Sequence, residues 1–185
     1  MKMSERPIKV LLVGSGTVGK TSLCTVYTKK CFPSKYVPTV MEIAFSTVVI
    51  NDVTHRLAIW DTAGQEDFDR LRLLSYPNTD VFLVCYAIDD LDSFQHVSTK
   101  WIPELHKHSP GVPIILVGTK LDKRHKGETL ESYLVPYSRG QSLAETIGVA
   151  HFAECSALNG KNVSKIFKIA AAAALGLDKK SCCIL

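Results

Sequence analysis

The amino-acid sequence predicts an α/β fold in which a six-stranded mixed sheet is covered by helices on both faces. Short apolar or β-rich segments recur along the chain, at residues 8–13, 45–50, 56–60, 81–86, 114–117 and 149–155. Most of them are continuously apolar, which is typical of parallel strands buried on both faces. The two segments joined by residues 51–53 are expected to form a hairpin. We therefore predict five parallel strands and one antiparallel edge strand.

Two apolar stripes with helical spacing lie between or after the later strands. One comprises Phe94, Val97, Trp101 and Leu105, and the other comprises Val163, Ile166, Phe167, Ala170 and Ala174. Such stripes indicate helices that pack one face against the sheet.

A phosphate-binding loop follows the first predicted strand. Residues 14–21 read Gly-Ser-Gly-Thr-Val-Gly-Lys-Thr, which matches G-x-x-x-x-G-K-[ST] between a strand and a helix. Its backbone N–H groups and the helix N-terminus favour bound phosphate. We expect Lys20 to reach the β- and γ-phosphates and the Thr21 hydroxyl to bind Mg²⁺. The expected nucleotide-binding residues here are Gly14, Ser15, Gly16, Thr17, Val18, Gly19, Lys20, Thr21 and Ser22.

The segment before the hairpin carries further candidates. Pro38 disfavours a helical conformation at the residue before it, so residues 36–39 are expected to form a loop. Thr39 would complete Mg²⁺ coordination only when a γ-phosphate is present. Loss of that phosphate would release the loop, which would act as an order–disorder switch. Tyr36 is expected beside the nucleotide. Phe32 would pack against the base, although its spacing fits a core anchor for the first helix equally well.

The sequence Asp61-Thr62-Ala63-Gly64-Gln65 follows the second strand of the hairpin. Asp61 is the expected second Mg²⁺ carboxylate, acting through water. Gly64 can bring its backbone N–H close to a γ-phosphate, and the Gln65 amide can hold an attacking water.

Two later segments indicate a guanine base. Thr119-Lys120-Leu121-Asp122 follows one strand, and the Asp122 carboxylate can accept hydrogen bonds from the guanine N1–H and exocyclic amine. Adenine would leave that carboxylate unpaired, which is costly in a buried site. Ser156-Ala157-Leu158 follows the last strand, where the Ala157 N–H could contact guanine O6 and Ser156 could brace the loop. Ligands bind beyond the carboxyl ends of such strands, so all these segments should converge on one crevice.

Composition limits the remaining possibilities. A length of 185 residues suits one domain, and a dispersed net charge of +4 does not indicate nucleic acid. The six cysteines include no C-x-x-C pair, so we expect neither a zinc site nor a disulfide framework. This cysteine usage indicates a reducing, cytosolic setting. The N-terminal residues lack an apolar signal region, and the alanine-rich stretch at 170–177 is too short to span a membrane.

Together these motifs resemble the Ras superfamily of small GTPases, and within it the Rho family near the Rac and Cdc42 branches. The most specific strings are residues 60–72 (WDTAGQEDFDRLR), 74–77 (LSYP) and 100–104 (KWIPE), with Thr119 in place of the usual Asn. The resemblance implies a P-loop small GTPase domain and a monomeric GDP/GTP switch that hydrolyses GTP slowly by itself. It implies catalytic roles for Gln65, Gly16 and Lys20. The implied partners are an exchange factor, a GTPase-activating protein, a dissociation inhibitor and effectors, with signalling to the cytoskeleton or to membrane processes.

Several positions depart from the family pattern. Ser15 replaces a common Asp, and residues 40–44 read Val-Met-Glu-Ile-Ala, which lacks both usual aromatic residues. Because aromatic residues anchor many interfaces, binding to the usual effector kinases is in doubt. The Rho-type insertion is recognisable at residues 123–136, with residues 129–131 resembling its helix, and it is shorter than in Rac.

The last four residues, Cys-Cys-Ile-Leu, fit a C-a-a-X prenylation motif, and leucine at the last position suggests geranylgeranylation of Cys182. We expect a GTPase domain over residues 1–177 and a flexible tail over residues 178–185. Only Lys179 and Lys180 lie near the lipid site, so the second signal for stable anchoring is weak. The expected location is the cytoplasmic face of a membrane, most simply the plasma membrane, with a cytosolic pool in which a dissociation inhibitor masks the lipid.

Two alternatives remain. One is a GTP-loaded scaffold with little hydrolysis, as in some atypical Rho proteins, which usually lose Gly16 or Gln65; this chain keeps both. The other is a P-loop metabolic kinase or ATPase, against which Asp122 and the lack of a lid for an acceptor substrate both argue.

Overall fold

The six predicted strands form a single sheet. In the computed structural model, which describes residues 6–35, 38–125 and 133–177, the strand order is β2-β3-β1-β4-β5-β6. Neighbouring strands pair in parallel except β2 and β3, which form an antiparallel hairpin. The predicted sheet of five parallel strands and one antiparallel edge strand is confirmed. The strands are β1 (Ile8–Val13), β2 (Met41–Ile50), β3 (Val53–Thr62), β4 (Val81–Ala87), β5 (Ile114–Thr119) and β6 (His151–Glu154).

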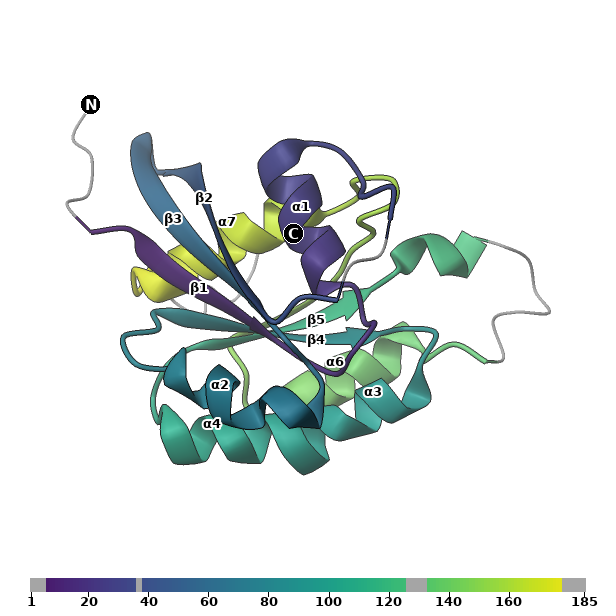
Figure 1. Ribbon diagram of the computed structural model, residues 1–185. Helices are drawn as coiled ribbons and strands as arrows, with labels where there is room; N and C mark the ends of the chain where they lie inside the picture. The colour runs from purple at the N-terminus through teal and green to yellow at the C-terminus, as the bar shows by residue number, and fades with distance from the viewer. Residues whose placement is uncertain (1–5, 36–37, 126–132, 178–185) are drawn as a thin grey trace.

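Helices cover both faces of this sheet (Figure 1). Alternate side chains of β4 are buried in the two opposite layers, Leu83 on one side and Phe82 on the other, because strand side chains alternate between faces. One face is covered by α1 (Lys20–Lys29) and α7 (Val163–Ala174). The other is covered by α2 (Asp69–Leu74), α3 (Leu91–His96), α4 (Ile102–His108) and α6 (Tyr137–Thr146).

The hairpin is longer than its sequence pattern indicates. β2 begins at Met41 rather than at residue 45, because its first residues pair with the end of β3 despite their weak β-pattern. The turn consists of Asn51 and Asp52 alone, both with positive φ, and Val53 already belongs to β3. A two-residue turn of this kind matches the twist of the flanking strands. At the opposite edge, β6 covers only the middle of the predicted segment 149–155.

The stripe that predicts one helix from Phe94 to Leu105 runs through three consecutive helical segments. A π-helical turn, Val97–Trp101, lies between α3 and α4. All four stripe residues are nevertheless buried, so the predicted packing face is confirmed. The second stripe lies in α7, with Ile166, Phe167 and Ala170 fully buried. The helix expected at residues 129–131 lies outside the described residues.

β1, β3, β5 and β6 all end at the same side of the sheet, and the loops that follow them carry the predicted motifs. In the described part of the chain, no helix combines the length and the apolarity that crossing a bilayer requires.

Candidate nucleotide-binding site

Two adjoining pockets lie at this side of the sheet and share Thr17, Gly19 and Ser22. The phosphate pocket is lined by Gly16, Thr17, Gly19, Lys20, Thr21, Ser22, Pro38, Thr39, Thr62, Ala63, Gly64 and Gln65. The base pocket is lined by Thr17, Gly19, Ser22, Leu23, Phe32, Thr119, Lys120, Asp122, Lys123, Cys155, Ala157 and Leu158. Segments far apart in the sequence therefore form one continuous crevice, as the sequence predicts.

The Lys20 ammonium group reaches back across the phosphate-binding loop. It donates hydrogen bonds to the carbonyl oxygens of Gly14 at 2.7 Å and Ser15 at 2.8 Å. Burial lowers the pKa of Lys20 to about 8, although the nearby Cys85 and Asp61 oppose that effect. Gly14 has a φ of 143°, and a Cβ there would lie 2.2 Å from the carbonyl oxygen of Cys85. Only glycine fits this crossing of the loop over β4.

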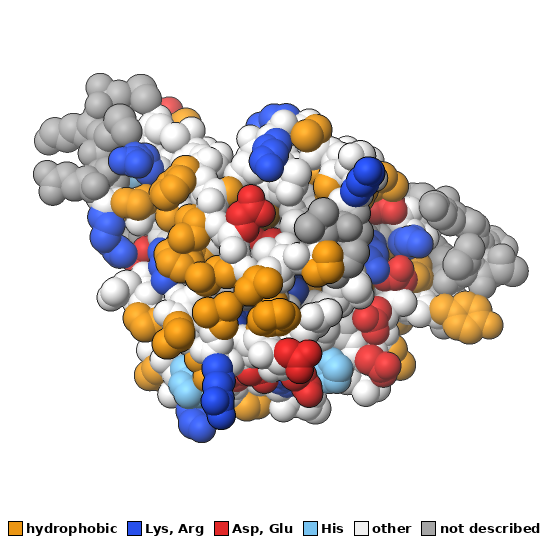
Figure 2. Space-filling model, viewed as in Figure 1, with side chains coloured by type: hydrophobic (Ala, Val, Ile, Leu, Met, Phe, Trp, Pro, Cys, Tyr) orange, Lys and Arg blue, Asp and Glu red, His pale blue; other side chains and the backbone are white. Residues whose placement is uncertain are grey.

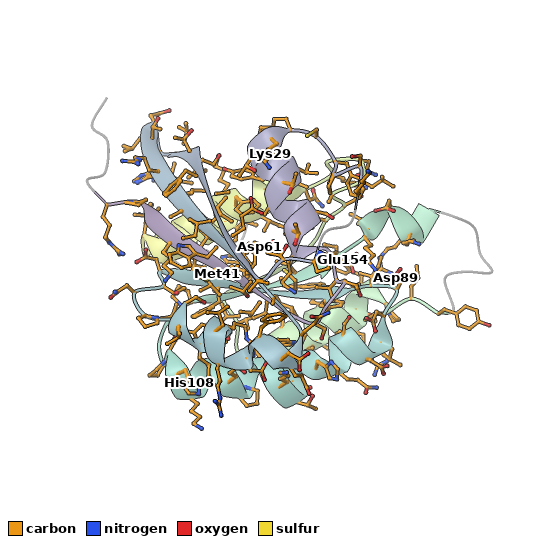
Figure 3. The ribbon with its side chains drawn as sticks, in the orientation of Figure 1. Lys29, Met41, Asp61, Asp89, His108 and Glu154 are labelled. Carbon is orange, nitrogen blue, oxygen red and sulfur yellow. The ribbon has the colours of Figure 1, made fainter. Side chains whose placement is uncertain are left out.

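A carboxylate and two hydroxyls meet beneath the phosphate pocket. Thr21 Oγ1 and Thr39 Oγ1 are 2.8 Å apart, so the loop before β2 reaches the first turn of α1. Asp61, 1% exposed, lies at the N-terminal end of α1 (Figure 3), and neither of its carboxylate oxygens has a hydrogen-bond partner within the described residues. Burial raises the pKa of Asp61, while the Thr21 hydroxyl and Lys20 oppose that effect. An unpartnered buried carboxylate beside two hydroxyls fits a hard divalent cation such as Mg²⁺.

The loop after β3 lies directly against the phosphate-binding loop. A Cβ on Gly64 would lie 2.2 Å from the Gly14 carbonyl oxygen and 2.6 Å from the Gly16 nitrogen. A Cβ on Gly16 would lie 3.8 Å from Gln65 Cγ, so the Gln65 side chain extends over that glycine. Ala63 N donates to Val40 O at 3.0 Å and thereby joins this loop to the start of β2. The predicted catalytic residues Gln65, Gly16 and Lys20 are brought together.

The base pocket is built on the ends of β5 and β6. Ser156, fully buried, donates to Asp122 Oδ1 at 2.5 Å and so orients the carboxylate expected to recognise guanine. The Thr119 hydroxyl contacts the carbonyl oxygens of Val18 and Tyr86 and ties β5 to the phosphate-binding loop. Phe32 lines this pocket and is 47% exposed, which argues against a core anchor.

Not every predicted residue lines a pocket. Neither lining includes Gly14, Ser15, Val18, Asp61 or Ser156, although all five neighbour residues that do line the pockets. Tyr36 lies outside the described residues, and so do Lys179, Lys180 and Cys182.

Sequence reasoning missed several residues of the site. Leu23, Lys123 and Cys155 line the base pocket, and Thr62 and Ala63 line the phosphate pocket. Asp89 also escaped notice; its carboxylate lies 3.1 Å from the Lys120 ammonium and 3.8 Å from that of Lys123. Asp89 follows the end of β4, so its position beyond a strand end was the available signal.

Two Arg–Glu pairs, each with one buried partner, were also missed. Arg72 of α2 pairs with Glu104 of α4, and Arg124, which follows β5, pairs with Glu154 of β6. Burial alone would lower the pKa of Arg72, but its hydrogen bonds to Glu104 and Tyr76 outweigh that effect, so the pKa is raised. Neither pair lines the two pockets. A surface-like charged residue in an amphipathic pattern carries no sequence signal that it will be buried with a partner.

Comparison with known proteins agrees with this geometry. The family model described as Ras family matches residues 9–175. The "GTP-binding protein RHO1" of Candida albicans is 44% identical over 188 aligned residues, which cover 96% of this chain and 95% of that protein. A chain of this family binds GDP and GTP, hydrolyses GTP, and works with exchange factors, activating proteins and effectors. The chain therefore belongs to the Ras family and, within it, to the Rho-type small GTPases, which act as GDP/GTP switches.

Proposed function

We propose that Gln65, Gly16 and Lys20 carry out the hydrolysis of GTP, in which water attacks the γ-phosphorus and the bond to the β-phosphate oxygen breaks. The observation that carries this proposal is the position of Gln65 over Gly16, at the rim of the phosphate pocket. From there the Gln65 amide can orient the attacking water. Gly16 leaves room for it, and the Lys20 ammonium can stabilise charge on the β- and γ-phosphate oxygens.

Magnesium fits the polar group formed by Thr21, Thr39 and Asp61. The two hydroxyls are 2.8 Å apart, and Asp61 is the buried carboxylate beside them. Thr21 and Thr39 would bind the cation directly and Asp61 through water. When bound, Mg²⁺ neutralises charge on the phosphate oxygens. The residues Thr21 and Thr39 would keep the loop before β2 against α1.

The same contacts supply a switch. Thr39 reaches the core through one hydroxyl contact to Thr21, and Gly64 reaches it through close backbone approach to Gly14. Thr39 and Gly64 also line the phosphate pocket, so a bound γ-phosphate would lie beside both loops. Loss of the γ-phosphate removes a shared partner of the two loops and releases them.

Guanine recognition belongs to Asp122 and its neighbours. Ser156 holds the Asp122 carboxylate, and Ala157 and Leu158 line the same pocket with Lys120 and Phe32. Two hydrogen bonds from guanine would satisfy that carboxylate, while adenine would leave it unpaired.

Single-turnover hydrolysis of bound GTP tests the catalytic assignment. Gln65→Leu keeps the side-chain size but removes the amide, so we expect hydrolysis to slow by about 10²-fold or more at unchanged GDP affinity. Gln141→Leu is the matched control, because Gln141 is an exposed residue of α6 outside both pockets. Equal hydrolysis by the wild-type and Gln65→Leu proteins would refute the assignment.

Magnesium is tested separately. Chelation should weaken GTP binding by the wild-type protein, and Asp61→Asn should reduce that dependence. The neutral amide keeps the shape of Asp61 but loses the charge that attracts the cation. Equal Mg²⁺ dependence of both proteins would contradict the proposed coordination.

We place the effector-binding surface along β2 and the residue before it, where the sequence departs from the family pattern. Hydrophobic side chains gather along β2 and beside it (Figure 2), and the exposed ones include Val40, Met41, Ile43 and Phe45. Met41, Ile43 and Phe45 alternate along β2 and share one face, whereas Ala44 packs against the core. The position of Ala44 is thus partly covered by the core, while Met41 is exposed to partners. We expect altered rather than abolished effector binding.

The tail points to reversible membrane attachment. Geranylgeranylation of Cys182 and a weak second signal at Lys179 and Lys180 support cycling between the cytoplasmic face of the plasma membrane and the cytosol, with a dissociation inhibitor covering the lipid. Fractionation of cells that express the intact chain or Cys182→Ser tests this. The variant should lose its membrane pool, and a salt-resistant membrane pool without any cytosolic protein would count against reversible attachment.

A further inference from the structure

The guanidinium group of Arg72 contacts the chain on both sides of Gln65. Before Gln65, the Ala63 carbonyl oxygen lies 3.5 Å from Arg72 Nη1. After Gln65, Asp69 Oδ1 accepts a hydrogen bond from the same nitrogen at 2.8 Å. Between these points lie Gly64, Gln65 and the short 3₁₀ turn Glu66–Phe68. A single turn of this kind is too short to hold its own position, so tertiary contacts must do so.

Arg72 is in turn held by α4. Its side chain is 0% exposed, and Nε and Nη2 donate to the Glu104 carboxylate at 3.2, 3.1 and 2.9 Å. The Tyr76 hydroxyl donates to the same carboxylate. The guanidinium carbon lies 4.7 Å from the ring centroid of Trp101, which is buried in the core. Fork-shaped, charge-assisted pairing of this kind fixes orientation as well as distance.

Lys100 makes a second connection between the same elements. Its ammonium group lies 3.3 Å from Glu66 Oε1 and 3.5 Å from Asp69 Oδ2. Glu66 and Asp69 follow Gln65 closely, and Lys100 belongs to the π-helical turn before α4. Both sides of Gln65 are therefore connected to the helical region of residues 97–108, whose Trp101 and Leu105 are buried in the core.

We propose that the Arg72–Glu104 pair is the positioning device for Gln65 in GTP hydrolysis, with Lys100 as a secondary connection. The proposal rests on the catalytic role of Gln65 proposed above. Arg72 and Glu104 lie outside the phosphate pocket, so they act through the loop that Arg72 contacts. A displacement of about 1 Å in a catalytic group costs about 10²-fold in rate, so loosening this loop should slow the chemistry.

Glu104→Gln tests the pair, because it removes the charge and one acceptor but keeps the side-chain volume. With GTP bound in advance, we expect hydrolysis to slow by about tenfold while GDP dissociation changes by less than about threefold. Glu154→Gln is the matched control, because it breaks the other Arg–Glu pair, away from Gln65. It should lower the melting temperature comparably and leave hydrolysis of bound GTP within about twofold. Equal hydrolysis rates in these two variants would overturn the proposal.

Lys100→Gln keeps the test decisive should Glu104→Gln fold poorly, since the Lys100 side chain is partly exposed. It should slow hydrolysis by about threefold without affecting stability, and an unchanged rate would count against the proposal. Adding Glu104→Gln to Gln65→Leu separates the two proposals. If Gln65→Leu alone has no effect, the catalytic assignment fails. If it slows hydrolysis and Glu104→Gln slows it further by the same factor as in the wild type, only the positioning role fails.

Discussion

The two ends of the nucleotide crevice are built in different ways. The base end stands on the ends of β5 and β6, where the buried Thr119 hydroxyl donates to the Tyr86 carbonyl oxygen of β4 and the buried Ser156 hydroxyl donates to Asp122. The phosphate end is closed by two loops, which are held by the Thr39 hydroxyl against Thr21, by the backbone of Gly64 against Gly14, and by Arg72 beside Ala63 and Asp69. The base end therefore rests on strand ends, whereas the phosphate end rests on contacts that loops make with one another and with α1 and α2; under the proposed switch, a bound γ-phosphate would add to these contacts. A switch needs this asymmetry, because it must hold GDP and GTP alike yet respond to one phosphate.

The largest expected effect is on nucleotide affinity, at the base end of the crevice. Asp122→Ala would remove the two charge-assisted hydrogen bonds that we propose between this carboxylate and guanine, so we expect GDP affinity to fall by about 10²- to 10⁴-fold. Weak binding of ATP should not change, because adenine cannot pair with this carboxylate. Titration of both nucleotides against both proteins measures the difference. An equal loss for the two nucleotides would mean that Asp122 supports the fold rather than guanine recognition.

At the phosphate end, Gly64→Ala tests the close approach of the two loops. The added Cβ would overlap backbone atoms of Gly14 and Gly16, which cannot move aside as a flexible side chain could. We expect hydrolysis of bound GTP to slow by about 10²-fold because Gln65 is displaced, with little change in GDP affinity. Measured together, the two quantities show whether the ends are separable. A parallel loss of GDP affinity would show that the two ends of the crevice are not independent.

Lys20 is part of the phosphate-binding loop and is proposed to contact the bound phosphates. The pH dependence of nucleotide affinity tests whether its charge matters. Burial lowers its pKa in the nucleotide-free protein to about 8, and bound phosphates must raise it. A proton is then taken up on binding, so above about pH 8 the affinity should fall by up to about tenfold per pH unit. GDP titrations from about pH 7 to 9 measure this. Lys20→Arg binds more weakly in this confined site but stays charged, so its affinity should lack that decline. The same decline in both proteins would exclude Lys20 as its source.

The smallest expected effect is on stability, at the Thr119 hydroxyl that connects β5 to the phosphate-binding loop. Thr119→Val leaves the buried carbonyl oxygens of Val18 and Tyr86 without the hydroxyl that they now contact, at a cost of about 1–3 kcal/mol in unfolding free energy. Thr119→Ser keeps the hydroxyl and should behave like the wild type. Denaturant unfolding of the GDP-bound proteins provides the measurement. Equal unfolding free energies of the two variants would contradict this role of the hydroxyl.

Motifs at strand ends made most of the site predictable. The phosphate-binding loop, the segments around Asp61 and Asp122, and their convergence follow from local patterns and from the geometry of parallel strands. Predictions were least accurate where pairing partners decide the outcome. β2 starts at Met41 because β3 extends alongside it, and β6 is shorter than its apolar run. Tertiary pairing of this kind overrides local propensity.

Local sequence patterns are enough to predict the sheet, the position of the crevice and the kinds of residue that line it, since these depend on periodicity and on short contiguous motifs. The packing of distant segments brings Ser156 to Asp122, the backbone of Gly64 to the opposite loop, and Glu104 to the buried Arg72, whose guanidinium contacts Ala63 and Asp69 on either side of Gln65. The three pairings join residues separated by tens of positions. Their existence depends on packing distances and shared burial, which no linear pattern records.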